Sequence, residues 1–271
     1  MTVDNSFFIK KFLKKTALFV AFSAASNMPF VVCDEETFND RIWVFDSEEQ
    51  VKKFAQPYLE KKYAIRAVKY PNKLFQAFFR SLWSMGVNEV VIVEDSRETV
   101  LELEQLQPKP DYSNLPPQRK PLVNDALVLT GMYFSQESNR PADVQDKEKL
   151  EEYQEELASN MLRAVYMLPV DLNEGPGSVA DKIKNREYKV PIVKMNNGDL
   201  LIPIFTDTME LGKYAKGKQL AALPVNFSGL AKTLSKEVKG YMLNPAGFHL
   251  IMSRELLETL PGQFEEEGEE E

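Results

Sequence analysis

Residues 190–215 constrain the fold of this chain most strongly, because they contain a hairpin signal followed directly by a helix start. Alternating apolar residues flank Asn197-Gly198, a dipeptide that tolerates the positive φ of a tight turn. Asp207 and Glu210 follow at the spacing at which an N-cap side chain and the side chain three residues later satisfy each other's free backbone N–H groups. The segment therefore predicts two paired strands and then a helix that begins at Asp207.

The same pattern occurs a second time, in residues 28–55. The corresponding residues of the two segments are Pro29 and Pro191, Phe45 and Phe205, Ser47 and Asp207, Gln50 and Glu210, and Ala55 and Ala215. The segments differ in length only within the hairpin loop, where a backbone most easily absorbs insertions. The repeat predicts an α+β chain of two tandem, similar α/β-sandwich-like domains, each a hairpin-containing mixed sheet packed with helices. The alternative is two unrelated α/β units that share generic strand-to-helix chemistry.

The chain has 271 residues, which is long enough for two domains of ordinary size. Prolines concentrate between the two repeats, where they remove backbone donors and fix φ: Pro108, Pro110, Pro116, Pro117 and Pro121. We therefore expect a first domain at 1–106, a proline-rich linker at 107–123 and a second domain at 124–261. Residues 262–271 are expected to form a disordered acidic tail, because they are too charged and too poor in apolar groups to pack.

Residues 7–25 are expected to form an amphipathic helix. Apolar residues recur there at three- and four-residue spacing, and pairs of lysines lie on the opposite face. The lysines, the apolar run and the small residues after it also resemble a secretory signal, which remains the alternative. No run approaches the roughly 20 apolar residues that cross a bilayer, so no membrane span is expected.

Residues 73–85 predict a helix with more aromatic surface than one core-facing stripe requires. Phe79 and Trp83 are the candidate anchors for another protein, because aromatic side chains dominate binding energy at interfaces. The alternative is that the extra aromatic side chains pack on the other domain or on the N-terminal helix.

The net charge and the cysteine count restrict the expected partners. A formal charge of −8 opposes non-specific attraction to nucleic acid, whose affinity rests largely on neutralised phosphates. The single cysteine, Cys33, excludes a disulfide within this chain and a zinc site with several cysteines. We therefore expect a cytoplasmic protein that does not bind nucleic acid. The repeat and the aromatic helix surface lead us to expect a protein partner or self-association instead.

Three runs of residues resemble a known family. They are LLIPIFTD at 200–207 with the helix after it, MLNPAG at 242–247, and HLIMS at 249–253. These runs resemble the N-terminal domain of the SseB family, whose members carry similar P-hydrophobic-F-T-D and hydrophobic-N-P-x-G signatures. The resemblance covers residues 164–257 and reaches 28–95 only through the repeat, where Phe45-Asp46-Ser47 replaces the Phe-Thr-Asp order and no Asn-Pro follows Val93. It implies a small α+β domain and no established chemistry.

The sequence lacks the usual signatures of catalysis, including GxGxxG, GxxxxGK[ST] and GxSxG. His249 is the only histidine, and we expect it to be structural or at the surface. Cys33 is expected to be a small buried apolar group, and the acids of 34–40 lack the order of a calcium loop. No catalytic residue, cofactor or metal is predicted, although catalysis by carboxylates alone stays open.

Two functions remain as hypotheses. The first is a non-enzymatic protein-interaction or regulatory module that uses the surface around Phe79 and Trp83. The second is a small-ligand sensor or cryptic enzyme with a pocket between the two repeats, near Thr206, Asp207 and Asn244. For these three residues, cap and turn chemistry is the competing expectation.

Overall fold

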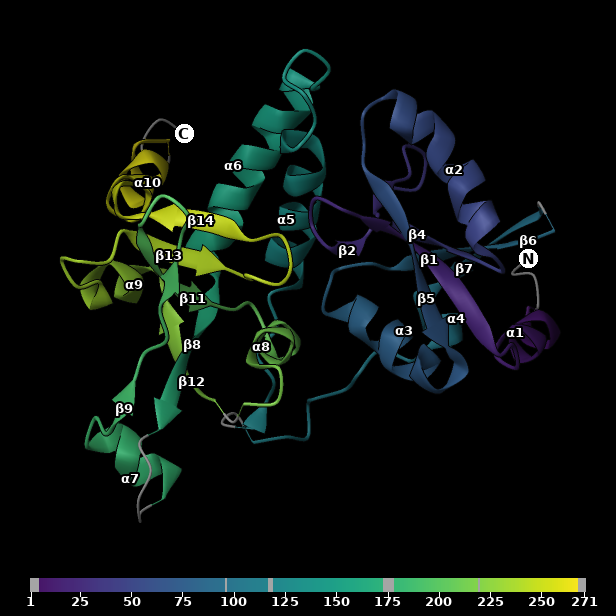
Figure 1. Cartoon of the computed structure of the whole chain (residues 1–271). Helices are drawn as coiled ribbons and strands as arrows, with labels where there is room; N and C mark the ends of the chain where they lie inside the picture. The colour runs from purple at the N-terminus through teal and green to yellow at the C-terminus, as the bar shows by residue number, and fades with distance from the viewer. Residues whose placement is uncertain (1–4, 96, 117–118, 173–177, 219, 268–271) are drawn as a thin grey trace. The chain divides into compact units, whose positions relative to one another are not determined.

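A computed structural model describes residues 5–95, 97–116, 119–172, 178–218 and 220–262, and the backbone alone of 263–267 (Figure 1). The chain divides into two compact units. Unit 1 comprises residues 1–118 and 128–153, and unit 2 comprises residues 119–127 and 154–271. The expected second domain began at residue 124, so the structure groups residues 128–153 differently from the sequence-based boundary.

Unit 1 is built on one mixed sheet. Its strands are β1 (Ala17–Ser23), β2 (Met28–Pro29), β3 (Val32–Cys33), β4 (Asp40–Phe45), β5 (Ile65–Pro71), β6 (Glu89–Glu94) and β7 (Arg97–Glu102). β4 and β6 are parallel, whereas β1 is antiparallel to both β4 and β5, and β7 is antiparallel to β6. The short strands β2 and β3 pair with β1 and β4.

The helices of unit 1 cover this sheet. They are α1 (Ser6–Phe12), α2 (Glu48–Glu60), the 3-10 turn η1 (Asn72–Leu74), α3 (Phe75–Trp83), α4 (Leu103–Leu106) and α5 (Asp125–Ser138), with the first part of α6 (Lys147–Arg163). α2 and α3 lie on opposite sides of the sheet (Figure 1). Trp43 and Phe45 of β4 and Val51 of α2 are buried in one cluster between the sheet and α2, and Phe54 of α2 packs against it.

The side-chain amide of Gln136 joins α5 to the segment after β2 in unit 1. The backbone N–H of Val31 donates to Gln136 Oε1 (3.0 Å), and Gln136 Nε2 donates to the carbonyl of Val31 (2.9 Å). Tyr133 and Tyr63 add hydroxyl donors, to Asp40 Oδ1 (2.6 Å) and Glu137 Oε2 (2.6 Å). Because Val31 and Gln136 are buried, these bonds satisfy backbone groups that water cannot reach.

Unit 2 contains two sheets. Its strands are β8 (Val165–Leu172), β9 (Tyr188–Lys189), β10 (Val193–Lys194), β11 (Leu200–Ile204), β12 (Ala221–Asn226), β13 (Gly240–Leu243) and β14 (Leu250–Ser253). One sheet has the order β10-β11-β13-β14, with β11 and β13 parallel, and the other has the order β12-β8-β9. An isolated antiparallel bridge between Met167 and Phe205 connects β8 to the end of β11. The helices are the end of α6, α7 (Val179–Lys184), α8 (Thr208–Ala215), α9 (Phe227–Thr233) and α10 (Arg254–Glu267).

The two units have the same strand connectivity. The order β5-β1-β4-β6-β7 in unit 1 corresponds to β12-β8-β11-β13-β14 in unit 2, with the Met167–Phe205 bridge in place of a longer β8–β11 pairing. In each unit the central parallel pair is followed by an antiparallel strand. Phe45 and Phe205, which the sequence placed at equivalent positions, both lie at the end of the first parallel strand.

The predicted α+β class and the predicted hairpin are confirmed. β10 and β11 pair antiparallel, and Gly198 supplies the positive φ (91°) of the turn between them. Within the described residues, every helix is too short or too polar to cross a membrane. α10 extends to Glu267, so residues 262–267 are helical where a disordered tail was expected, while residues 268–271 lie outside the described residues.

The predicted N-terminal helix over residues 7–25 is wrong beyond its first part. α1 ends at Phe12, and residues 17–23 form β1, a strand hydrogen-bonded on both sides. The apolar run fits a strand because Leu18 and Val20 are fully buried on one face while Phe19 and Ala21 join the cluster under α2 on the other. A short apolar run buried on both faces has no periodicity that distinguishes a strand from a helix.

Candidate functional site

The candidate site of unit 2 lies where the parallel strands β11 and β13 end. β11 leads through Thr206 and Asp207 into α8, and β13 leads into the turn 244–247. In that turn the N–H of Gly247 donates to the carbonyl of Asn244 (2.9 Å), which is the i to i+3 bond of a β-turn. Ends of parallel strands collect polar loops on one edge of a sheet, and ligand sites of α/β proteins often lie there.

The structure brings together the three residues that the sequence singled out. The N–H of Thr206 donates to Asn244 Oδ1 (3.0 Å), and Asn244 Nδ2 donates to Thr206 Oγ1 (2.9 Å). Thr206 Oγ1 donates in turn to Asp207 Oδ2 (2.8 Å). Thr206, Asp207 and Asn244 are all buried, so their polar atoms are engaged with one another inside unit 2.

Asp207 is the N-cap of α8, as predicted. Its Oδ1 accepts hydrogen bonds from the backbone N–H groups of Met209 (2.8 Å) and Glu210 (3.0 Å). Asn124 closes the other side, because its Nδ2 donates to the carbonyls of Thr206 (2.6 Å) and Val165 (2.9 Å). Asn124, Thr206, Asp207 and Asn244 therefore form one hydrogen-bonded group that joins β8, β11, β13 and the start of α8.

The reciprocal half of the predicted capping pair is wrong. Glu210 does not accept from the Asp207 backbone; instead it is buried, its Oε1 forms an ion pair with Lys213, and its Oε2 is a buried atom without a hydrogen-bond partner among the described residues. A side chain added at Gly247 would place Cβ 2.8 Å from this Oε2, so the turn packs directly on the carboxylate. Burial raises the pKa of Glu210, the nearby charge of Asp207 acts in the same direction, and Lys213 opposes both.

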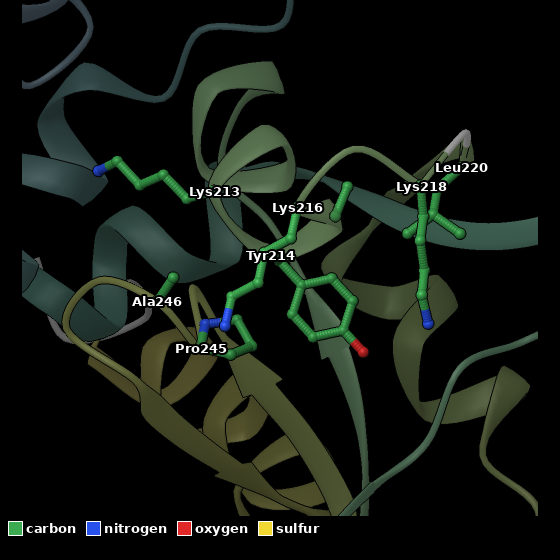
Figure 2. A pocket seen from close by; sticks show the side chains of 8 residues that line it. Lys213, Tyr214, Lys216, Lys218, Leu220, Pro245 and Ala246 are labelled. Atoms are coloured by element: carbon green, nitrogen blue, oxygen red, sulfur yellow. The ribbon is translucent and has the colours of Figure 1, made fainter.

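A pocket of about 460 Å³ lies beside this group, at the C-terminal end of α8. Its lining consists of Lys213, Tyr214, Ala215, Lys216, Lys218, Leu220, Pro245 and Ala246. Figure 2 shows the Tyr214 ring near the centre, with Pro245 on one side of it and Leu220 on the other. The pocket therefore combines cationic side chains with an aromatic and apolar floor.

The end of α8 has a defined conformation that presents the lysines. Lys216, the C-cap, is left-handed (φ 46°) and its N–H donates to the carbonyl of Gly212 (3.4 Å). Gly217 continues with φ 88°, and the N–H of Lys218 donates to the carbonyl of Ala215 (2.9 Å). Such C-terminal turns satisfy the last carbonyls of a helix, so the turn that carries Lys216 and Lys218 is held by backbone bonds.

In unit 1, a lysine forms ion pairs with acidic residues at both of the corresponding strand ends. Lys15 Nζ lies 2.5 Å from Asp46 Oδ1 and 2.5 Å from Glu94 Oε1, which follow β4 and end β6. Ser47 caps α2 by accepting from the N–H of Gln50 (3.3 Å), as predicted. Gln50 Oε1 accepts from the N–H of Asp46 (3.0 Å), one residue before the expected position.

The aromatic candidates on α3 differ in accessibility. Phe79 is 1% exposed and packs on Phe12 of α1 (ring centroids 6.3 Å apart). Trp83 is half-buried, its Nε1 donates to the carbonyl of Gln107 (3.0 Å), and Lys109 Nζ lies 5.6 Å from its ring. Much of the extra aromatic surface of α3 therefore contacts α1 and the segment after α4, which leaves Trp83 as the accessible member of the pair.

The residues considered for catalysis or metal binding are distributed over both units. His249 is exposed in unit 2, whereas Cys33 lies in unit 1 and is exposed, so its predicted burial is wrong. Cys33 ends a two-residue strand next to the hairpin loop, where little covers it. Asp34 pairs with Arg41 (2.7 Å) and accepts from Thr37. Within the described part of the chain, no three His, Cys, Asp or Glu side chains group as metal ligands would.

Sequence reasoning missed the lysine-lined pocket, Asn124 and the burial of Glu210. The KYAKGK run at 213–218 was a visible signal, because its lysines surround one tyrosine in a glycine-containing helix end. Asn124 carried no local signal, since the backbone carbonyls that it contacts belong to Val165 and Thr206, far along the chain.

Comparison with known proteins supports the family resemblance in the second part of the chain. Residues 143–259 match the domain family described as "SseB protein N-terminal domain". This range contains the strands of unit 2 and the signatures at 200–207 and 242–247, and it does not include residues 28–95.

Two other comparisons add little. A search of curated proteins found no significant match. Among solved structures, "Anabaena Tic22 (protein transport)" aligns over 97% of this chain and 98% of its own, with 11% sequence identity and a TM-score of 0.20. A TM-score this low does not indicate a shared fold.

Proposed function

We propose that this chain, whose residues 143–259 resemble an SseB N-terminal domain, is a non-enzymatic protein-interaction or regulatory module. The observation that carries the proposal is the open pocket at the end of α8, lined by lysines, a tyrosine and apolar side chains. The lysines can pair with acidic groups of a partner protein, and the tyrosine and apolar side chains can contact its apolar residues. The neighbouring Thr206, Asp207 and Asn244 already bond to one another and to backbone, which supports a structural role for them.

A cross-linked pull-down tests this function. The tagged full chain is incubated in an extract of its source cells, cross-linked, and its partners are identified by mass spectrometry. The purified partner is then titrated against the full chain by calorimetry. We expect a saturable complex of defined stoichiometry. A chain that captures only itself, and carries a bound small molecule in native mass spectra, would contradict the proposal.

Trp83 is proposed as a second contact for the partner. It is the accessible member of the Phe79 and Trp83 pair, whereas Phe79 packs on Phe12. Polar substitution of Phe79 would therefore test folding as much as binding. Trp83→Gln, with Phe79 retained, should weaken capture of the partner, and circular dichroism checks that the variant is still folded.

The pocket volume favours a second candidate, a small-ligand sensor or cryptic enzyme. About 460 Å³ falls within the range of roughly 300–1,000 Å³ that small-molecule sites occupy. Native mass spectrometry of the purified chain distinguishes the two candidates. A stoichiometric bound metabolite that is lost when the pocket lysines are replaced would favour the sensor.

We also propose that the two units are tandem SseB-like copies. The equal strand connectivity and the equivalent positions of Phe45 and Phe205 support a duplication. The proposed setting is the cytoplasm, as the single exposed cysteine suits a reducing compartment.

A further inference from the structure

We propose that the pocket at the end of α8 binds an acidic peptide segment of the partner protein, with glutamate or aspartate on both sides of an apolar residue. This inference rests on the proposed interaction function and specifies its site and ligand chemistry.

The charges of the pocket are spread out. Lys213, Lys216 and Lys218 are exposed and line the same pocket. In Figure 2 the Lys213 and Lys218 side chains extend in different directions, on opposite sides of Tyr214. Cations arranged in this way do not converge on one small anion, whereas they can each pair with a separate carboxylate along an extended peptide.

The lysines differ in their existing partners. Lys213 already forms an ion pair with Glu210. Among the described residues, no carboxylate forms a salt bridge with Lys216 or Lys218, so these two cations are available to a ligand without breaking an internal pair. We therefore assign them the larger contribution to binding.

The floor of the pocket suits an apolar side chain. Tyr214, Leu220, Pro245 and Ala246 are half-buried and line the same pocket as the lysines. An aromatic or aliphatic residue of the peptide can cover this floor while flanking carboxylates reach the ammonium groups. Burial of such an anchor, surrounded by charge pairs at the rim, is the usual arrangement of a protein interface.

The helix end also disfavours phosphate. Bound phosphate is typical of helix N-termini, where backbone N–H groups point at the anion, whereas this pocket lies at the C-terminus of α8. The partial negative charge of a helix C-terminus opposes every anion, carboxylates included. A peptide ligand therefore gains its affinity from the lysines and from apolar contact with Tyr214, Leu220, Pro245 and Ala246, and phosphate lacks the apolar contact.

The test uses the full chain and a fluorescein-labelled peptide Glu-Glu-Phe-Glu-Glu, with binding followed by fluorescence anisotropy at low and high salt. The pocket variant is Lys216→Asn with Lys218→Gln, since asparagine tolerates the left-handed conformation of residue 216 and Lys213 keeps its pair with Glu210. The matched control is Lys232→Gln with Lys236→Gln, which removes the same charge from exposed positions elsewhere in unit 2. Circular dichroism checks that both variants are folded.

We expect the pocket variant to weaken peptide binding by about tenfold or more, the control to change it by less than about twofold, and a Gln-Gln-Phe-Gln-Gln peptide not to bind. Equal losses in the pocket variant and the control, or inorganic phosphate that displaces the peptide at sub-millimolar concentration, would overturn the inference. Absence of peptide binding by the wild type would overturn it as well. If the pull-down partner is still captured equally by the pocket variant, the interaction function stands and only this site assignment fails.

Discussion

At the scale of single residues, Asn244 links the ends of the two parallel strands β11 and β13 in the candidate site. It is fully buried and left-handed (φ 48°), and both atoms of its amide bond to Thr206. Its backbone carbonyl accepts from Gly247 and His249, so the residue fixes the whole turn after β13. A role in folding and a role in ligand binding predict different consequences of its removal.

Asn244→Ala should lower the free energy of unfolding by about 2–4 kcal/mol, because it leaves the buried N–H of Thr206 without a partner and places alanine in a left-handed conformation. Urea denaturation of both proteins measures this loss. Asn185→Ala is the control, since Asn185 is exposed, and it should change stability by less than about 0.5 kcal/mol. A stable Asn244→Ala variant with impaired ligand binding would instead indicate a functional role.

Glu210 should make stability depend on pH. Burial raises its pKa above the ordinary value of 4.5, so the folded state binds this proton more tightly than the unfolded state. The resulting stability is fully present below the unfolded pKa and is lost as pH rises through the folded pKa. Glu210→Gln cannot titrate, so the unfolding free energy of the wild type should fall relative to this variant as pH increases from about 4.5.

Urea denaturation at a series of pH values tests the Glu210 prediction. Glu237→Gln removes one exposed carboxylate and controls for the change in net charge. The measured quantity is the difference between the two variants at each pH. A constant difference across the series would show that Glu210 is not protonated more readily in the folded protein.

At the scale of elements, β13 and β14 approach each other at Gly240. A Cβ at this position would lie 2.2 Å from the carbonyl oxygen of Met252 and 3.0 Å from the Cα of Ser253. Both are backbone atoms, which cannot move aside as a flexible side chain can. The pairing of these two strands therefore requires glycine here.

Gly240→Ala should destabilise the protein by about 1–3 kcal/mol, the usual cost of overpacking. Gly212→Ala is the matched control, because nothing lies within 4 Å of its Cβ position inside α8. Alanine favours a helix interior over glycine by about 1 kcal/mol, so this control should be stabilised. Thermal and urea unfolding compare the two, and equal effects would contradict the close approach of β13 and β14.

The sequence predicted those elements whose signals are local. The Asn197-Gly198 hairpin and the Asp207 cap depend on residues within a few positions, and both form as expected. The reciprocal capping bond of Glu210 did not form, because this side chain lies against Gly247, which only the tertiary structure brings near it. The pairing of Gln136 with Val31 joins residues 105 apart in sequence, and no local pattern could indicate it.

At the scale of the whole molecule, the course of the chain between the units differs from the boundary that the sequence suggested. The proline-rich segment ends before α5, yet most of α5 and the start of α6 belong to unit 1. The hydrogen bonds that join Gln136 to Val31, Tyr133 to Asp40 and Glu137 to Tyr63 support this grouping. A cut in the proline-rich segment would thus separate unit 1 into two pieces that still pack together.

This arrangement predicts that a nicked chain stays associated. A site-specific protease sequence inserted between Ser113 and Asn114, which are exposed, would yield fragments 1–113 and 114–271 after cleavage. The two fragments should co-elute on size-exclusion chromatography without denaturant, because residues 128–153 of the second fragment pack within unit 1.

Gln136→Ala leaves both backbone groups of Val31 unpaired, so the nicked variant should dissociate at a lower urea concentration than the nicked wild type. Gln154→Ala changes an exposed position on α6 and should not have this effect. Fragments that separate spontaneously would instead place residues 124–261 in an independent second domain, as the sequence-based boundary has it.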